Sequence, residues 1–278
     1  MALRIVHSMR GFVRPSRIIA GWLAAMLIAA GAPVTAAPQR VVSMNLCTDQ
    51  LAMLLAAEGQ LISVSHLARD PRMSAMAETA ANYPVNHGRA EEIYLLRPDL
   101  VIAGQFESGP TLQMLRRLGI RVEVLPPAES IKAIRSGITR MGELLVREDA
   151  AADLLAGFDR ELARVRSDHY RGKAALYYAN GITSGRNTLA GTILDAAGYE
   201  NIAGDYGVDS TTGLPLELVV MAQPDRLITG AKWPGQSRSE AILDHPALKK
   251  LAPDTAEVTD RDWVCGTPFI LRAIEALQ

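Results

Sequence analysis

Two copies of one pattern, 126 residues apart, constrain the fold of this chain more than any other sequence feature. The first copy runs from Glu91 to Gly104 and the second from Glu217 to Gly230. A glutamate opens both copies. Pro, Asp, Ile and Gly recur at the same positions, and apolar residues are matched between them. Such self-similarity indicates that one structural unit occurs twice.

Each copy predicts the same local structure. A short amphipathic helix begins at the glutamate, whose negative charge is favourable at a helix N-terminus. The proline ends this helix, the apolar run that follows predicts a buried strand, and the glycine lets the chain turn. Two weaker pairs occur in the same order: Leu115–Leu118 resembles Leu248–Leu251, and Leu55–Gly59 resembles Leu194–Gly198. Three pairs in one order predict two lobes of the same architecture.

Strands and helices alternate within each half, which is typical of parallel α/β sheet. The predicted strands are 41–44, 62–65, 100–103 and 122–125 in the first half and 174–178, 226–229 and 255–258 in the second. Between the halves, Glu148–Arg166 has helical spacing throughout. We therefore expect two Rossmann-like lobes joined by one long connecting helix, with a ligand cleft between them. The expected divisions are a signal peptide over 1–36, an N-terminal lobe over 37–146, the connecting helix over 147–168 and a C-terminal lobe over 169–278.

The N-terminus predicts export. Four arginines precede an apolar run over Ile18–Ala30, small residues follow at 34–37, and no acidic residue occurs before Asp49. This order is typical of a cleavable secretory signal, and the run is shorter than the roughly 18–20 residues of a membrane-spanning helix. We expect cleavage after Ala36 and a soluble periplasmic protein.

The charge balance bears on the possible partners. Without the signal the chain has 25 basic and 30 acidic residues, a net charge near −5. Nucleic-acid-binding proteins normally present a basic surface, so we expect no nucleic-acid partner. An exported enzyme on a Rossmann-like fold is disfavoured, because Met44–Asp49 lacks the glycines that cradle phosphate and no Gly-x-Ser-x-Gly elbow occurs. A receptor for a bare metal ion is the nearer alternative, although few histidines are available for it.

Export signal, two lobes and the repeated pattern together resemble the class III periplasmic binding proteins of ABC importers. The resemblance covers Gln39–Gln278 and is strongest at Arg40–Ser43 and Arg97–Ile102. It implies a monomeric, non-catalytic protein that captures a metal chelate and delivers it to a permease dimer. In that family one glutamate on each lobe docks into arginine pockets of the permease, and by motif position these are Glu91 and Glu217. Helix capping explains one such glutamate but not the paired recurrence.

Ligands of α/β sheets bind beyond the carboxyl ends of the strands, so residues at these ends form the candidate ligand-binding set. The set is Asn45, Cys47, His66, His87, Gln105 and Phe106 in the first lobe and Tyr178, Asn180, Trp233, Trp263 and Cys265 in the second. Aromatic rings with a few polar groups suit a small-molecule pocket. We assign no protein-held metal and no cofactor.

Two points stay open at the level of sequence. Cys47 and Cys265 fall one in each lobe, and either a disulfide across the cleft or two unpaired thiols fits. Ligation of a metal in the cargo is a minor alternative, because thiolates suit soft metals. The cargo is also open: basic candidates for gripping acidic siderophores are only Arg69, Arg89 and Arg186, and the several tryptophans of cobalamin-binding relatives are absent. We expect an iron–siderophore complex or other metal chelate first, with a corrinoid or haem next.

Overall fold

The computed structural model describes residues 36–278 except 233, 236, 252–254 and 259. Residues 37–278 form one compact unit. The predicted signal peptide, apart from Ala36, lies outside the described residues, as does Trp233. None of the helices in the described residues combines the length and the apolar character that crossing a membrane requires.

The first lobe is built on a five-stranded parallel sheet in the order β3-β2-β1-β4-β5. Its strands are β1 (Val41–Ser43), β2 (Leu61–Ser65), β3 (Val85–Asn86), β4 (Leu100–Gly104) and β5 (Val122–Leu125). Its helices are α1 (Leu46–Leu55), the 3-10 turn η1 (His66–Arg69), α2 (Ala77–Ala80), α3 (Ala90–Leu95) and α4 (Gly109–Arg117). Strand β4 is buried along its whole length, as the apolar run predicts.

The second lobe contains a four-stranded parallel sheet in the order β11-β10-β6-β8. Its strands are β6 (Gly172–Leu176), β8 (Tyr199–Asn201), β10 (Arg226–Gly230) and β11 (Thr255–Val258). Its helices are α7 (Leu189–Ala197), α8 (Leu216–Ala222), α9 (Pro246–Leu251), α10 (Asp260–Trp263), α11 (Ile270–Ala276) and the 3-10 turns η2 (Ala179–Gly181), η3 (Ile202–Tyr206) and η4 (Ala241–Asp244). A two-stranded antiparallel sheet, β7 (Ile182–Ser184) with β9 (Thr211–Gly213), is an addition that the sequence did not predict.

The two sheets confirm the duplication. The repeated pattern supplies β4 in one lobe and β10 in the other, and each lies between the first and the last strand of its parallel sheet in chain order. The aspartate of each copy has the same function. Asp99 accepts hydrogen bonds from the backbone N–H groups of Gln39 and Arg40, and Asp225 accepts one from that of Lys173. Each aspartate therefore ties the end of its own helix to the start of the lobe's first strand.

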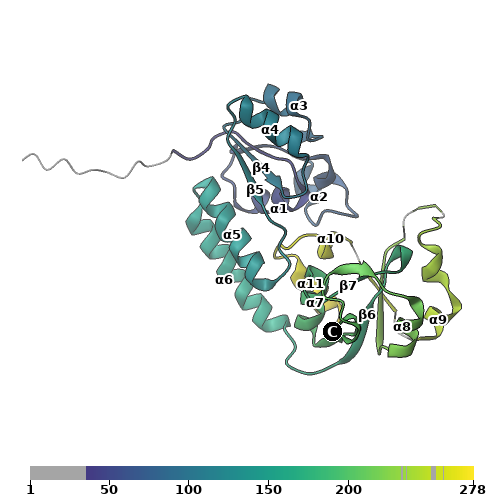
Figure 1. Cartoon of the computed structure of the whole chain (residues 1–278). Coiled ribbons are helices and arrows are strands. Elements are labelled where there is room, and N and C mark those ends of the chain that lie inside the picture. The colour runs from purple at the N-terminus through teal and green to yellow at the C-terminus, as the bar shows by residue number, and fades with distance from the viewer. Residues whose placement is uncertain (1–35, 233, 236, 252–254, 259) are drawn as a thin grey trace, which may run out of the picture. The chain divides into compact units, whose positions relative to one another are not determined.

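Helix α6 (Glu148–Val165) connects the lobes, and α5 (Ile131–Leu145) packs antiparallel beside it (Figure 1). The sequence predicted α6 but not this pairing. A Cβ on Gly142 of α5 would lie 2.5 Å from the Cβ of Ala151, so glycine permits the close approach of the two helices. Phe158 and Leu162 of α6 share one continuous core with residues of both lobes.

Candidate functional site

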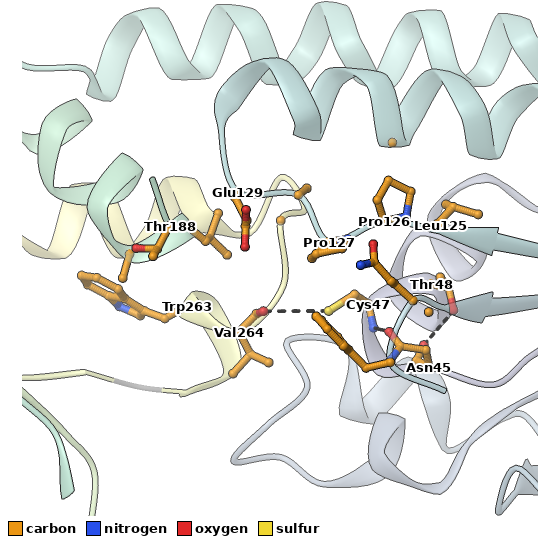
Figure 2. A pocket seen from close by; sticks show the side chains of 18 of the residues that line it. Asn45, Cys47, Thr48, Leu125, Pro126, Pro127, Glu129, Thr188, Trp263 and Val264 are labelled. Atoms are coloured by element: carbon orange, nitrogen blue, oxygen red, sulfur yellow. Dashed lines mark hydrogen bonds between the residues drawn. The ribbon is translucent and has the colours of Figure 1, made fainter. Parts of the chain in front are cut away.

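A cavity of about 440 Å³ lies between the two lobes and opens at the carboxyl ends of their strands. From the first lobe it is lined by Asn45, Cys47, Thr48, Leu51, Gly104, Gln105, Phe106, Leu125, Pro126, Pro127, Ala128, Glu129 and Gly137. From the second it is lined by Tyr178, Ser184, Thr188, Leu189, Ala190, Thr211, Trp263, Val264 and Gly266. Figure 2 shows the labelled members converging from the two sides. Its position is the one at which α/β sheets bind ligands.

The N-terminus of α1 forms one wall of this cavity. Asn45 caps the helix, because its side-chain oxygen accepts a hydrogen bond from the Cys47 N–H. The Asn45 amide donates to Glu107 at 3.2 Å, which fixes the orientation of the side chain. A Cβ on Gly104 would come within 2.8 Å of this amide, so the glycine that ends β4 leaves room for Asn45.

The N-terminus of α7 forms the facing wall. Thr188 caps α7 by accepting a hydrogen bond from the Gly191 N–H, and its hydroxyl donates to the Gly185 carbonyl. One helix N-terminus from each lobe therefore points toward the cavity. Their partial positive charges favour ligand groups that accept hydrogen bonds.

The structure brings six of the eleven predicted site residues together in the cavity lining. Those that line the cavity are Asn45, Cys47, Gln105, Phe106, Tyr178 and Trp263. Cys265 lies between the lining residues Val264 and Gly266 but is itself buried. Trp233 lies outside the described residues.

His66, His87 and Asn180 are not among the residues that line the cavity. The two histidine rings stack on each other with centroids 5.2 Å apart, and His87 binds Glu92 through its backbone N–H and its ring. Asn180 lies in the 3-10 turn η2 with φ of 58°, where its backbone N–H donates to Ser239. The first-lobe lining comes from the carboxyl ends of β1, β4 and β5, whereas β2 and β3 lie on the other side of β1 in the sheet order. Within the described residues, no group of three or more His, Cys, Asp or Glu side chains could hold a metal ion.

Sequence reasoning missed two lining segments. The first is Pro126–Glu129, which follows β5 and lies in the cavity wall. It could have been found, because β5 has a carboxyl end like the other strands. The second comprises Ser184 and Thr211 of the unpredicted β7–β9 sheet, and Thr188–Ala190 at the start of α7. Strands β7 and β9 are short and mostly polar, so no apolar run marks them in the sequence.

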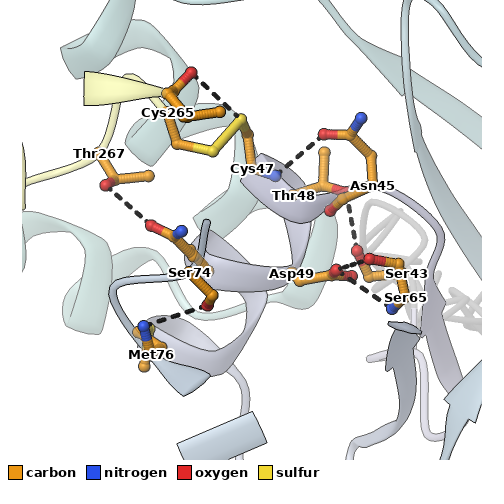
Figure 3. The surroundings of a disulfide bond; sticks show 12 residues. Ser43, Asn45, Cys47, Thr48, Asp49, Ser65, Ser74, Met76, Cys265 and Thr267 are labelled. Carbon is orange, nitrogen blue, oxygen red and sulfur yellow. Dashed lines mark hydrogen bonds between the residues drawn. A yellow bond between two sulfur atoms is a disulfide. The ribbon is translucent and has the colours of Figure 1, made fainter. Parts of the chain in front are cut away.

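A disulfide joins Cys47 of the first lobe to Cys265 of the second, with the Cα atoms 5.1 Å apart. Of the readings that the sequence left open, the structure has the paired one. Close by, the Thr267 hydroxyl and the Gln50 side-chain oxygen form a buried hydrogen bond of 3.2 Å between the same two segments (Figure 3). The lobes are therefore covalently linked beside the cavity, in addition to the connection through α5 and α6.

Behind the α1 wall lies a buried carboxyl group. Asp49 is fully buried and accepts hydrogen bonds from the backbone N–H and hydroxyl of Ser65. Burial raises the pKa of Asp49 to about 6, although the hydrogen bonds from Ser43 and Ser65 oppose this shift. Its other oxygen, Oδ1, has no hydrogen-bond partner among the described residues. The first turn of α7 contains no acidic residue, so the second lobe has no counterpart of this group.

The cavity lining is almost uncharged. Of the lining residues in the described part of the chain, Glu129 alone is charged, and no Lys, Arg or His is among them. The basic candidates named from the sequence are absent from this lining. Arg69 donates to the backbone carbonyls of Ala80, Ala81 and Tyr83, and Arg186 pairs with Asp209. The side chains of the described lining therefore offer no full positive charge to pair with an anionic ligand, and the two helix N-termini supply only partial positive charge.

Glu91 and Glu217 lie away from the cavity, in the first turns of α3 and α8. Both are exposed, and neither forms an ion pair with any other described residue.

Two parallel α/β lobes of the same topology, a connecting helix and a largely apolar cavity between the strand ends define a two-lobed solute-binding protein. The model of the Periplasmic binding protein family matches residues 41–253, and the chain belongs to that family. Membership places it among binding proteins rather than enzymes, and it confirms the fold expected from the duplication.

The comparisons with individual proteins agree with this assignment. The chain is 28% identical over 226 residues to a cobalamin-binding protein of Halobacterium salinarum, covering 78% of this chain and 59% of that protein. It thus spans about three-fifths of that relative's length. It is 27% identical over 219 residues to a vitamin B12-binding protein of Pectobacterium carotovorum, covering 75% of this chain and 76% of the relative. The structure of a periplasmic haem-binding protein from Roseiflexus sp. RS-1 superposes with a TM-score of 0.70 at 23% identity, covering 86% of this chain and 99% of that one, and shows the common fold.

Proposed function

We propose that this chain is the exported receptor of an ABC importer and that its cargo is a corrinoid of the cobalamin type. The N-terminal segment would direct export and be removed after Ala36. The mature monomer would capture the corrinoid between its lobes and deliver it to a permease dimer. The relatives named as cobalamin-binding and vitamin B12-binding proteins support this choice of cargo.

The single observation that carries the choice of cargo is the charge of the cavity lining. Haem has two propionate carboxylates, and many siderophore complexes are anionic, so their receptors need cationic side chains to offset the cost of desolvating those charges. The described lining offers no such side chain and one carboxylate, Glu129. The periphery of a corrinoid is rich in neutral amides, which both donate and accept hydrogen bonds. We therefore rank the corrinoid above the siderophore complex, reversing the order expected from the sequence.

The polar groups around the cavity also suit an amide-rich ligand. Asn45, Gln105, Ser184, Thr188 and Thr211 offer neutral donors and acceptors from both lobes. Phe106, Tyr178 and Trp263 offer ring surface against which a flat macrocycle can pack.

Delivery would use the exposed glutamates at equivalent positions of the duplicated pattern. Glu91 and Glu217 are free of ion pairs within the described residues and are apart from the cavity, so basic residues of a permease can pair with them without disturbing captured cargo. A permease dimer has two equivalent surfaces, which matches one glutamate on each lobe.

The test is calorimetric titration of the purified mature protein with cyanocobalamin, with haem and with a ferric hydroxamate siderophore, each in a separate experiment. We expect saturable binding of cyanocobalamin alone. Binding of haem or of the siderophore complex without cyanocobalamin would contradict the proposed cargo while leaving the family assignment intact.

A pair of variants locates the binding site. Ala190 lines the cavity, and Ala190→Trp should block it and abolish cyanocobalamin binding. Ala163 is exposed on α6 outside the cavity, so Ala163→Trp is the matched control and should bind normally. Equal affinity of both variants would move the binding site away from this cavity.

A further inference from the structure

The two glutamate-bearing helices each present a large apolar side chain to solvent. Leu95 is 77% exposed on α3, and Met221 is 73% exposed on α8. The two positions are 126 residues apart, the same offset that relates Glu91 to Glu217. Each apolar residue follows its glutamate by four positions, so the two side chains are neighbours on one face of the helix. Each lobe thus presents a carboxylate and an apolar side chain together.

The exposure of these residues follows from how both lobes hold the helix. In each copy the third residue, Ile93 or Val219, is fully buried, which fixes the rotation of the helix on its lobe. The residue before each proline, Arg97 or Gln223, adopts a positive φ of 50° or 45°, so the chain turns away at the same position of the pattern, although α8 ends one residue later than α3. The two helices are therefore presented in the same way by lobes with different sequences.

Most other exposed apolar side chains have a counterpart that is polar or more buried. Tyr94, at 49% exposed, corresponds to the half-buried Val220, and Val124 corresponds to Glu257. Among the large apolar side chains of the described residues, Leu95 and Met221 are the pair that is more than 70% exposed in both copies. Single exposed apolar residues are common on protein surfaces, but chance does not explain why both copies expose one at the same position beside the same glutamate.

We propose that Leu95 and Met221 are apolar contacts for the permease, one on each lobe and each beside a docking glutamate. The partner surface would contain, twice over, an apolar pocket next to a basic residue, and its two-fold repetition matches the repetition on this chain. The apolar contact excludes water from the neighbouring ion pair, which strengthens that pair. This inference rests on the proposed delivery to a permease, but not on the identity of the cargo.

The first experiment places a photo-crosslinking amino acid at position 95, at position 221 or, as a control, at position 170 in cells of the source organism. Tyr170 is 69% exposed but lies outside both copies of the repeated pattern. Adducts at 95 and at 221 with the same permease subunit, identified by mass spectrometry, and none at 170, are the expected result. Absence of permease adducts at both positions would overturn the proposal. This readout is independent of cargo, so it separates failure of this inference from failure of the proposed cargo.

The second experiment measures uptake of cyanocobalamin by cells whose native copy is replaced. We expect the double variant Leu95→Ser with Met221→Ser to reduce uptake at least tenfold, each single variant to reduce it several-fold, and Tyr170→Ser to transport normally. The apolar exchange Leu95→Met with Met221→Leu should restore uptake. All variants should keep the wild-type affinity for cyanocobalamin and the wild-type melting temperature. Normal uptake by the double serine variant would overturn the proposal.

Discussion

The two lobes resemble each other at the helices that carry the exposed glutamates, and they differ at the cavity. On the surface formed by α3 in one lobe and α8 in the other, the exposed glutamate, the exposed apolar residue, the buried third position and the anchoring aspartate all recur. At the cavity the lobes diverge. The first lobe passes directly from β1 to α1, whereas the second inserts η2 and β7 between β6 and α7.

This difference separates two kinds of constraint on a duplicated protein. A partner with two equivalent surfaces requires the same features on both lobes. A small ligand is asymmetric, so the two cavity walls are free to differ, and they do: Asn45 and the segment Pro126–Glu129 face Tyr178, Thr188 and Trp263. The outward surface is therefore the place to look for docking, and the cavity walls are the place to look for ligand specificity.

The largest expected effect comes from breaking the covalent link between the lobes. The disulfide spans 218 residues of sequence, and restraint of an unfolded loop of that length contributes about 2–5 kcal/mol to the free energy of unfolding. We expect Cys47→Ser with Cys265→Ser to lower the midpoint of urea unfolding accordingly, with wild-type protein in reducing agent matching the variant. Coincident curves for oxidised wild type and variant would contradict a stabilising cross-lobe bond.

The second prediction uses a group that only the first lobe has. The pKa of Asp49 is raised from 3.8 to about 6 in the folded state, so the unfolded chain releases this proton at lower pH than the folded chain. The resulting stabilisation is fully present below pH 3.8, is lost as the pH rises toward 6, and amounts to about 3 kcal/mol at most. Asp49→Asn should remove this decline. Between pH 4 and pH 7 the unfolding free energy of the wild type should therefore fall relative to that of the variant.

The control for Asp49 is Asp153→Asn, an exposed site on α6. Its urea midpoints should follow those of the wild type at every pH. If Asp49→Asn also follows the wild type across this range, Asp49 does not titrate as its burial implies.

Much of the fold could be predicted because the repeated pattern occurs at long range and in order. The apolar runs at β4 and β10 each lie between a helix-ending proline and a glycine, and the structure has strands there. The short strands β7, β8 and β9 could not be predicted, because they are mostly polar and lack an apolar run like the one that revealed the equally short β1. The pairing of α5 with α6 depends on the contact of Gly142 with Ala151, which no local pattern reveals.

Strand ends led to six of the residues that line the candidate cavity. Asn45 and Gln105 follow β1 and β4 and line it, whereas His66 and His87 follow β2 and β3, on the other side of β1, and do not. Strand order is a three-dimensional property, so the sequence alone could not tell on which side of β1 each strand lies. The sequence likewise could not show that the lining lacks basic residues. Arg186 was a candidate for it, but in the structure this side chain pairs with Asp209.

The third prediction compares the aromatic side chains of the two cavity walls. Trp263 is half-buried against the core at the cavity wall, whereas Phe106 is 84% exposed. Because a fixed ring loses less entropy on binding than a mobile one, we expect Trp263→Ala to weaken cyanocobalamin binding by about 1–3 kcal/mol and Phe106→Ala by less than about 1 kcal/mol. Calorimetric titration measures both. A larger loss at Phe106 would assign the main stacking surface to the first lobe.

The smallest expected effects test whether the duplicated aspartates are equivalent. Asp99 accepts two backbone hydrogen bonds and Asp225 one, so alanine leaves two N–H groups unpaired in the first lobe and one in the second. Both carboxylates are exposed and water can replace part of each bond, which limits the cost to about 1–2 kcal/mol for Asp99→Ala and about 1 kcal/mol for Asp225→Ala. Urea unfolding measures both, with Asp153→Ala as an exposed control expected to show no loss. Equal losses of unfolding free energy would mean that only one of the two hydrogen bonds to Asp99 contributes to stability. A larger loss at Asp225 would contradict the expectation that the cost follows the number of hydrogen bonds. In either case ligand affinity should stay unchanged, because the aspartates lie at the opposite ends of their strands from the cavity.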